Sequence, residues 1–140
     1  AMIVGLIQCS KTKKHGTMMA ASMYYASYIW RTNFQILKAR CDVVFILSDK
    51  YGLITPDEII SSYEASPYDL TPEEVDLLML LVLDGLPSDT EELLVTMMPK
   101  VLRTRLLQLL PSSIIFNALF EGVPLFKMHK RLSDLKKQYL

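Results

Sequence analysis

The sequence predicts an α/β fold: a single three-layer domain in which about four mostly parallel strands lie between helices on both faces. Short apolar runs rich in Val and Ile, typical of buried parallel strands, alternate with longer segments of helical periodicity. Such alternation is typical of a parallel sheet covered by helices. The 140 residues contain no linker, internal repeat or low-complexity tract. We therefore expect one domain over residues 1–140.

The first third of the chain predicts two strands joined by a long helix. Residues 2–8 form an apolar run that ends in a polar loop, as expected for a buried strand. Residues 18–40 contain no Pro or Gly and repeat apolar side chains at spacings of three and four, which predicts one long amphipathic helix. Residues 41–47 (CDVVFIL) are β-branched and aromatic and too few for a helix, so we expect a second buried strand.

Two similar tetrapeptides predict helix starts in the rest of the chain. Residues 55–58 (TPDE) combine a capping Thr, a Pro in the first turn and two acids, which predicts the start of a helix. Residues 71–74 (TPEE) repeat the pattern and predict a helix over 72–84, closed by Gly85. The remaining expected elements are a strand at 92–97, a helix at 99–110, a strand at 114–119 and a basic helix at 124–139.

Composition limits the class of protein. Hydrophobic residues make up 51% of the chain and charged residues 21%, which excludes intrinsic disorder. No run of 18 residues is free of charge or proline, so we expect no membrane partner. Cys9 and Cys41 are too few for a disulfide framework, and with two His they show no metal-ligand spacing. We therefore expect a cytoplasmic protein with neither a metal nor a cofactor.

Charge is segregated along the chain although the net charge is zero. Residues 1–41 carry a net charge of +6, residues 42–99 a net charge of −12, and residues 100–140 a net charge of +6. If the two ends pack side by side, they form a basic face that attracts phosphates. The alternative is that the ends pair with the acidic middle through surface contacts of small energetic consequence.

Polar loops follow the first two predicted strands. In open parallel sheets, ligands bind beyond the carboxyl ends of the strands, where these loops lie. In the first loop, Ser10, Lys13 and Lys14 precede a helix, an arrangement suited to holding an anion, although neither a Walker A loop nor a GxGxxG fingerprint is present. The alternative is a solvated lysine loop.

The second loop contains Ser48, Asp49, Lys50, Tyr51 and Gly52. Gly52 is expected to supply a positive φ, which would direct Ser48 and Lys50 into a crevice beside the first loop. Lys50 is the one basic residue within 42–99. Its alternative role is an ion pair with a nearby acid of the same stretch.

The sequence offers candidate catalytic residues, but no constellation that identifies a reaction. Cys9 would act as a nucleophile if the neighbouring lysines and a helix N-terminus favoured its thiolate, with His15 or His129 as base. A buried packing role for Cys9 is the alternative. Ser48, Asp49 and Lys50 are the other candidates in the same loops.

Residues 47–63, LSDKYGLITPDEIISSY, resemble the LSxxYGLxxPxxxIxxY signature of the YaaA-like proteins. This superfamily includes a bacterial peroxide-stress protein and smaller domains of unknown function in bacteria, archaea and phages. The flanking matches occur in the same order: Cys9-Ser10-x-x-Lys13, Tyr24-Tyr25-Ala26-Ser27 with Trp30, Pro124-Leu125, and Lys130-Arg131-Leu132-x-x-Leu135.

The resemblance implies an α/β domain linked with the stress response, with protection of DNA and with DNA binding in the larger protein. Similar motifs also occur beside enzymes that modify nucleic-acid bases. The signature ends at Tyr63, which the resemblance adds to the residues around the crevice.

Three functions follow as hypotheses. The first is binding of nucleic acid or a nucleotide in the crevice, with a basic surface on the nucleic-acid backbone that includes Arg103, Arg105, Lys127, Lys130 and Arg131. The second is an enzyme that acts on a nucleoside, nucleotide or modified base in the same crevice. The third is a homo-oligomeric interaction module that associates through the apolar helix 72–84.

Overall fold

Four neighbouring strands of a five-stranded sheet pair in parallel in the computed structural model, which describes residues 2–64 and 69–140. They are β1 (Met2–Gln8), β3 (Val43–Ser48), β6 (Thr90–Thr96) and β7 (Ile115–Ala118). The sheet order is β4-β3-β1-β6-β7, and β4 (Gly52–Ile54) pairs antiparallel with β3 at one edge. The predicted α/β class with a mostly parallel sheet is confirmed. Each of the four strands expected from the sequence is present, and β4 was not expected.

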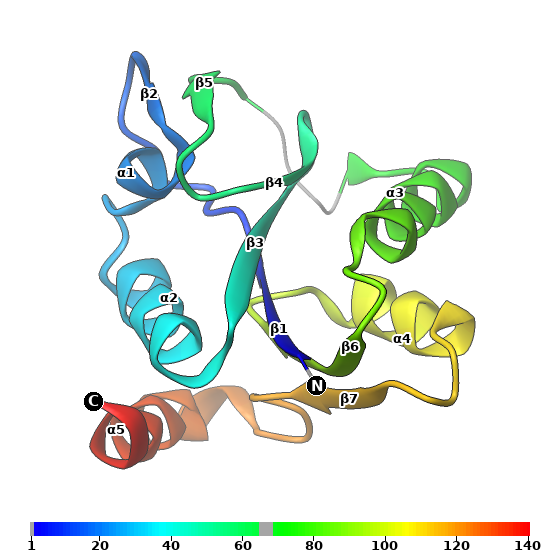
Figure 1. Cartoon of the computed structure of the whole chain (residues 1–140). Helices are drawn as coiled ribbons and strands as arrows, with labels where there is room; N and C mark the ends of the chain where they lie inside the picture. Colours follow the sequence, from blue (N-terminus) through cyan, green and yellow to red (C-terminus); the bar gives the residue numbers. More distant parts are fainter. Residues whose placement is uncertain (1, 65–68) are drawn as a thin grey trace.

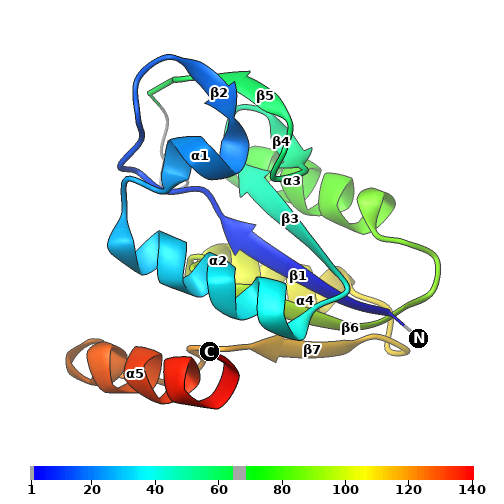
Figure 2. The ribbon, with the colours of Figure 1, turned by 60° about the vertical axis from the view of Figure 1, so that its left-hand side comes forward.

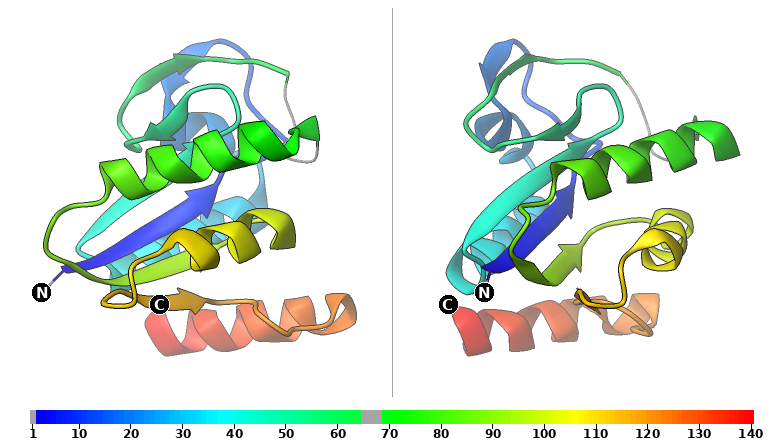
Figure 3. Two further views of the ribbon diagram at one scale, coloured as in Figure 1. Left: turned by 90° about the vertical axis from the view of Figure 1, so that its right-hand side faces the viewer. Right: turned by 45° about the vertical axis from the view of Figure 1, so that its right-hand side comes forward.

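Helices lie on both sides of this sheet (Figure 1). On one side, α2 (Tyr28–Arg40) packs between β1 and α5 (Met128–Tyr139). On the other side, α3 (Pro72–Gly85) packs against α4 (Lys100–Leu109). Figure 3 shows α3 and α4 side by side, with α5 beyond the sheet.

Alternate side chains of the strands supply two separate hydrophobic cores, as the period of two in a strand requires. Ile7 and Ile46 face α2 and α5, together with Trp30. Leu6 and Leu47 face α3 and α4. The central strands are therefore buried on both faces, and their apolar runs reflect this burial.

The helix predicted over 18–40 is wrong as a single element. The structure has a short strand β2 (Thr17–Met19), a helical turn α1 (Ala20–Tyr24) and then α2 (Figure 2). The break occurs because the Ser27 side chain accepts a hydrogen bond from the backbone N–H of Trp30 and so caps α2. Apolar residues keep the helical spacing across the break, so a prediction from spacing alone does not detect the break.

The helix predicted to start at residues 55–58 is also wrong. Thr55 donates its hydroxyl to Asp57 Oδ1 at 2.7 Å, and its N–H donates to Glu58 Oε1 at 3.1 Å, so the capping interactions close a turn. The chain continues into β5 (Ile59–Ser61), which pairs antiparallel with β2. The turn's carbonyls at positions 56 and 58 accept hydrogen bonds from the first N–H groups of α1. Tertiary pairing of two distant segments therefore replaces the helix.

The other helix starts agree with the sequence. Thr71 and Glu74 form the reciprocal capping box that the TPEE pattern predicts for α3. The basic C-terminal helix is present as a 3₁₀ turn, η2 (Leu125–Lys127), followed by α5. Among the described residues, no helix is long and apolar enough to cross a membrane.

Candidate functional site

The loops that leave β1 and β3 meet at the carboxyl edge of the sheet. The two strands are neighbours, and the Cys9 N–H donates to the Leu47 carbonyl at 2.8 Å as the chain leaves them. Side chains join the loops as well, because Gln8 Nε2 donates to Asp49 Oδ1 at 2.8 Å. The predicted juxtaposition of the two polar loops is confirmed. We call the region around Gln8, Cys9, Lys13, Asp49, Lys50 and Tyr63 the polar crevice.

Ser48 shapes the second loop. Its Oγ accepts the backbone N–H groups of Lys50 at 3.2 Å and Tyr51 at 3.0 Å, and it lies 2.9 Å from the Tyr63 hydroxyl. Because both lone pairs of the Ser48 oxygen accept these N–H groups, its own proton points to Tyr63. Ser48 is fully buried, so we assign it to the shape of the turn. Gly52 follows with a φ of +75°, which confirms the expected positive φ.

Tyr63 lies at the centre of a chain of hydroxyl groups. Its hydroxyl is 2.7 Å from that of Tyr24 and 2.9 Å from Ser48 Oγ. Burial raises the pKa of both tyrosines, so both stay protonated at neutral pH. The network holds the Tyr63 ring in place between α1 and β3. The signature of the resemblance ends at Tyr63, and Tyr24 belongs to one of the flanking matches.

Two lysines from different loops lie over the same tyrosine ring. Lys13 Nζ is 4.5 Å from the Tyr63 ring centre, and Lys50 Nζ is 6.0 Å from it and 5.4 Å from the Tyr51 ring centre. Within the described part of the chain, neither lysine forms an ion pair. A hollow of about 240 Å³ adjoins Lys13 and Tyr63, and its other lining residues are Lys11, His15, Ser62 and Glu64, whereas Gln8, Asp49 and Lys50 do not line it. The lysines therefore concentrate positive charge at the crevice.

Asp49 and Cys9 lie side by side below these lysines. Cys9 Sγ is 3.5 Å from Asp49 Oδ2, and Cys9 is only 7% exposed. Burial, and secondly the Asp49 carboxylate, raise the pKa of the Cys9 thiol. Burial also raises the pKa of Asp49, against the opposing effect of its hydrogen bonds. The thiol is therefore protonated at neutral pH, which does not favour the activated nucleophile that the sequence allowed.

Gln8 is a candidate that the sequence analysis missed. Gln8 is only 1% exposed, and its side-chain Nε2 donates a hydrogen bond to Asp49. Its Oε1 has no hydrogen-bond partner among the described residues. A buried acceptor without a partner is costly, so a hydrogen bond from a water molecule or a ligand at this oxygen would be favourable. Gln8 is the last residue of an apolar run, and that break in the run was the signal available.

The other residues of the first loop contribute less. The Ser10 hydroxyl is buried and accepts the Thr12 N–H at 3.2 Å, which shapes the loop. The Lys14 side chain is exposed, while its backbone N–H donates to the Met23 carbonyl. Among the described residues, no group of three or more His, Cys, Asp or Glu side chains is placed to hold a metal ion.

The basic residues predicted to contact a nucleic-acid backbone lie outside the polar crevice. Arg103 and Arg105 belong to α4, where they pair with Glu121 at 3.0 Å and Asp76 at 2.7 Å. Arg131 of α5 donates to the Leu119 carbonyl at 3.0 Å. Lys127 and Lys130 are exposed on η2 and α5. The structure thus does not join these five residues to Lys13 and Lys50, and the guanidinium groups already have partners within the chain.

Comparison with known proteins gives one match. A family model described as "Family of unknown function (DUF6884)" matches residues 4–112. This range includes both loops of the polar crevice. No curated protein and no solved structure matches the chain.

Proposed function

We propose, for a chain that belongs to the DUF6884 family of unknown function, that the polar crevice binds a nucleotide, free or as a unit of a nucleic acid. The observation that carries this proposal is the convergence of Lys13 and Lys50 on Tyr63 at the carboxyl edge of β1 and β3. Their ammonium groups suit a phosphate, and the hollow of about 240 Å³ has room for a phosphate and part of a sugar.

Gln8 and Asp49 supply the complementary half of the site. Access to the Gln8 Oε1, which is buried in this structure, requires the side chain to turn toward the ligand, whereas the half-buried Asp49 carboxylate is partly open to it. A nucleobase edge or a ribose hydroxyl carries the donors that these oxygens need. Discrimination follows from the same pairing, because a ligand without the donor leaves the Gln8 oxygen buried and unpaired.

Isothermal titration calorimetry with the four ribonucleoside monophosphates, the matching nucleosides and inorganic phosphate tests this function. We expect at least one monophosphate to bind more tightly than its nucleoside, because the nucleoside lacks the group that the lysines hold. Lys13→Ala should weaken that binding by about tenfold, the value of one charge-assisted hydrogen bond. Lys38→Ala, an exposed lysine of α2, is the matched control. Binding that Lys13→Ala and Lys38→Ala weaken equally would contradict the proposal.

We also propose that the chain is a single three-layer YaaA-like domain and acts in the cytoplasm, linked with DNA protection or base modification. The positions that the signature residues occupy in the structure support the proposed relationship to the YaaA-like proteins. Ser48, Tyr51 and Tyr63 are spaced along the signature, yet they contact one another in the crevice. Gly52 provides the positive φ that the turn between them requires.

A second candidate function is an enzyme that acts on a nucleoside, nucleotide or modified base. The observation that favours it is Asp49, whose pKa is raised by burial and which therefore resembles a general acid or base. Turnover of nucleosides and nucleotides by the wild-type chain, lost in Asp49→Asn and Lys50→Ala, would establish it. Turnover that both variants retain would exclude these residues from the reaction.

The third candidate function is self-association through α3. Leu77, Leu80 and Leu81 are 64%, 51% and 53% exposed on this helix, whose other face packs in the core. Such an apolar patch favours an interface. Sedimentation velocity should show a dimer that Leu77→Lys dissociates, and a monomer at high concentration would contradict this role.

A further inference from the structure

We propose a second binding site, for a small organic anion with an apolar body, in a cavity of about 560 Å³ at the carboxyl ends of β6 and β7. We call it the apolar cavity. Its residues come from α2, α4, η2, α5 and the segments after β6 and β7, and they include Met97, Lys100, Phe120, Leu125, Met128, His129 and Leu132. This volume lies within the range of about 300–1,000 Å³ typical of small-molecule sites.

The topology of the sheet favours a ligand at this position. After β1 the chain continues through α2 to β3 on one side of β1, and it later returns to β6 on the other side. Strand order therefore reverses between β1 and β6. In open α/β sheets, ligands bind outside the carboxyl ends of the strands at such a reversal. The apolar cavity lies there, since α2 and the start of α4 both line it.

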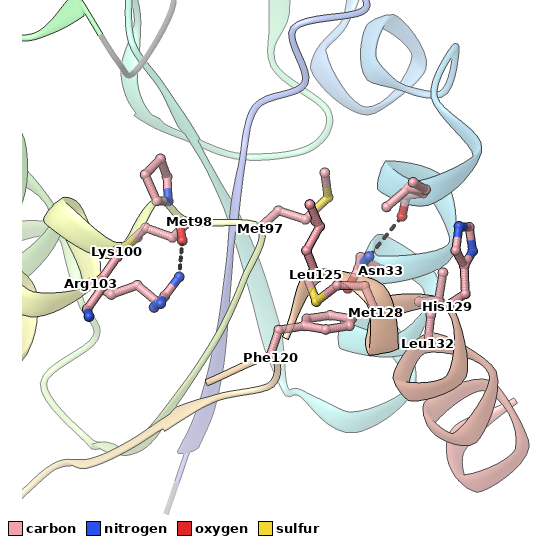
Figure 4. Close-up of a pocket in the computed structure, with 12 residues that line it drawn as sticks. Asn33, Met97, Met98, Lys100, Arg103, Phe120, Leu125, Met128, His129 and Leu132 are labelled. Carbon is pink, nitrogen blue, oxygen red and sulfur yellow. Dashed lines mark hydrogen bonds between the residues drawn. The ribbon is translucent and has the colours of Figure 1, made fainter. Parts of the chain in front are cut away.

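The lining indicates an apolar ligand body. Figure 4 shows Met97, Leu125 and Met128 between α4 on one side and α5 on the other. Phe120 and Leu132 complete this apolar surface, while Leu125 is 87% exposed at its edge. Methionine side chains adapt to the shape of a ligand and contact aromatic rings favourably. A flat or branched apolar group would therefore find contacts on several sides.

The charged groups indicate an anion. Lys100 begins α4, a ten-residue helix whose N-terminus has no side-chain cap. Within residues 2–64 and 69–140, no carboxylate lies within ion-pair distance of Lys100, whereas Glu121 pairs with Arg103. His129 also lines the cavity, and no acidic side chain among the described residues does. A carboxylate, sulfonate or phosphate on the ligand would meet both Lys100 and the positive end of the helix.

Met97 is held in an unusual backbone conformation. Its φ is +61°, in the left-handed region that a side chain other than glycine seldom adopts. Such conformations are strained for a residue other than glycine and cluster at functional sites. Here the conformation occurs where the chain leaves β6 and begins to line the apolar cavity.

This site does not rest on the proposed nucleotide function. The hollow of the polar crevice and the apolar cavity share no lining residue. The two sites are therefore testable in separate experiments on one protein. Occupation of one should be detected with the other either filled or empty.

A matched pair of fluorescent probes tests the proposal. The probes are 1-anilinonaphthalene-8-sulfonate, which carries an anionic group, and N-phenyl-1-naphthylamine, which has the same aromatic body without charge. We expect one molecule of each probe to bind with increased fluorescence. Lys100→Ala should weaken the sulfonate by about three- to fivefold, the value of an exposed ion pair, and leave the neutral probe unchanged. Lys127→Ala, an exposed lysine outside the cavity, is the control.

A second variant makes the location testable. Met128→Trp places a larger side chain in the apolar cavity and should weaken both probes, whereas Ile59→Trp on the exposed side of β5 should not. Circular dichroism confirms that each variant is folded. Probe binding that Met128→Trp leaves intact, or that Ile59→Trp abolishes, would place the probes elsewhere and overturn the proposal. Equal loss of both probes in Lys100→Ala would overturn the anionic part. Displacement of the probes by nucleotide would show that the two sites are not independent.

Discussion

Asp49 is the residue that links the two loops of the polar crevice. It accepts a hydrogen bond from Gln8 and contacts Cys9, and both partners belong to the neighbouring strand's end. Burial favours its neutral form, so the folded chain maintains this carboxylate at a cost in stability. A carboxyl group whose pKa is shifted by burial in this way is typical of binding and catalytic sites.

The pH dependence of stability reports this effect. Because the folded pKa of Asp49 lies above its ordinary value of 3.8, the unfolded chain ionises first as the pH rises. Stability is therefore lost from about pH 4 upward until the folded pKa is passed. Asp49→Asn retains an oxygen that accepts the Gln8 hydrogen bond. Because the amide cannot ionise, the variant does not lose stability as the pH rises. We expect its melting temperature to exceed that of the wild type by on the order of 2 °C at pH 7, with the difference vanishing near pH 3.

The control for this prediction is Asp134→Asn, which changes an exposed acid of α5. Differential scanning calorimetry between pH 3 and pH 8 measures both variants. A difference between Asp49→Asn and the wild type that shrinks with rising pH would show that the charged form stabilises the fold.

Cys9 gives a second prediction at this scale. Its raised pKa predicts slow alkylation by iodoacetamide at pH 7, with a rate that still rises at pH 9. Asp49→Asn removes a charge that raises this pKa, so the rate at pH 8 should increase by about threefold. The measurement requires a Cys41→Ser background, although burial raises the pKa of Cys41 to about 12. An alkylation rate that no longer changes between pH 7 and pH 9 would show that the Cys9 thiol is already ionised at pH 7, and it would support the nucleophile hypothesis.

Single residues differ in how well the sequence predicts them. Lys13 stands out in a lysine-rich loop that follows a strand, Lys50 as the one basic residue of an acidic stretch, and the structure places the two lysines together. Gln8 and Tyr24 are buried polar groups within apolar segments. Their importance depends on partners 39 or more positions away, at Asp49 and Tyr63. Spacing within one segment carries no information about such partners.

At the scale of elements, local signals succeed when no distant segment competes with them. The Thr-Pro pattern occurs twice, and it starts a helix at Thr71 but closes a turn at Thr55. The difference is the pairing of β5 with β2, which extends the chain after residue 58. The strands were predicted well because burial on both faces makes them continuous apolar runs.

The capping box of α3 makes the element scale testable. The Thr71 side chain accepts the Glu74 N–H at 3.2 Å, and the Glu74 carboxylate accepts the Thr71 N–H at 3.1 Å. Thr71→Ala removes the first bond and should cost about 1 kcal/mol, or ~3 °C in melting temperature. Thr104→Ala changes an exposed Thr within α4 and is the matched control. Equal melting temperatures for the two variants would contradict the role of the cap.

At the scale of the whole molecule, the structure shows where the basic ends and the acidic middle of the chain lie. The two basic ends do pack side by side, because α5 lies against α2 and Lys136 Nζ is 2.9 Å from the Tyr28 hydroxyl. The acidic middle also pairs with them, through Arg40 with Glu92 at 3.7 Å and Arg105 with Asp76 at 2.7 Å. Segments of the two basic ends therefore pack together and also pair with the acidic middle, and a basic face that attracts phosphates stays a prediction.

Salt dependence distinguishes the basic residues at this scale. If the ligand is a single-stranded nucleic acid, Lys13→Ala should reduce the slope of log affinity against log salt by about one phosphate contact. Arg131→Ala should leave that slope unchanged, since its guanidinium donates to the Leu119 carbonyl. Fluorescence anisotropy with labelled single-stranded DNA and RNA measures the slopes. An equal reduction by both variants would extend the binding surface to α5.

The central claim is that the polar crevice holds a nucleotide, and a nuclear magnetic resonance titration tests it most directly. Amide resonances of the ¹⁵N-labelled chain are followed as the tightest-binding monophosphate is added. We predict that the largest shifts fall at residues 8–15, 48–51 and 63, and that the Gln8 side-chain amide shifts with them. Shifts confined to the lining of the apolar cavity, or spread over exposed lysines without saturation, would contradict the claim.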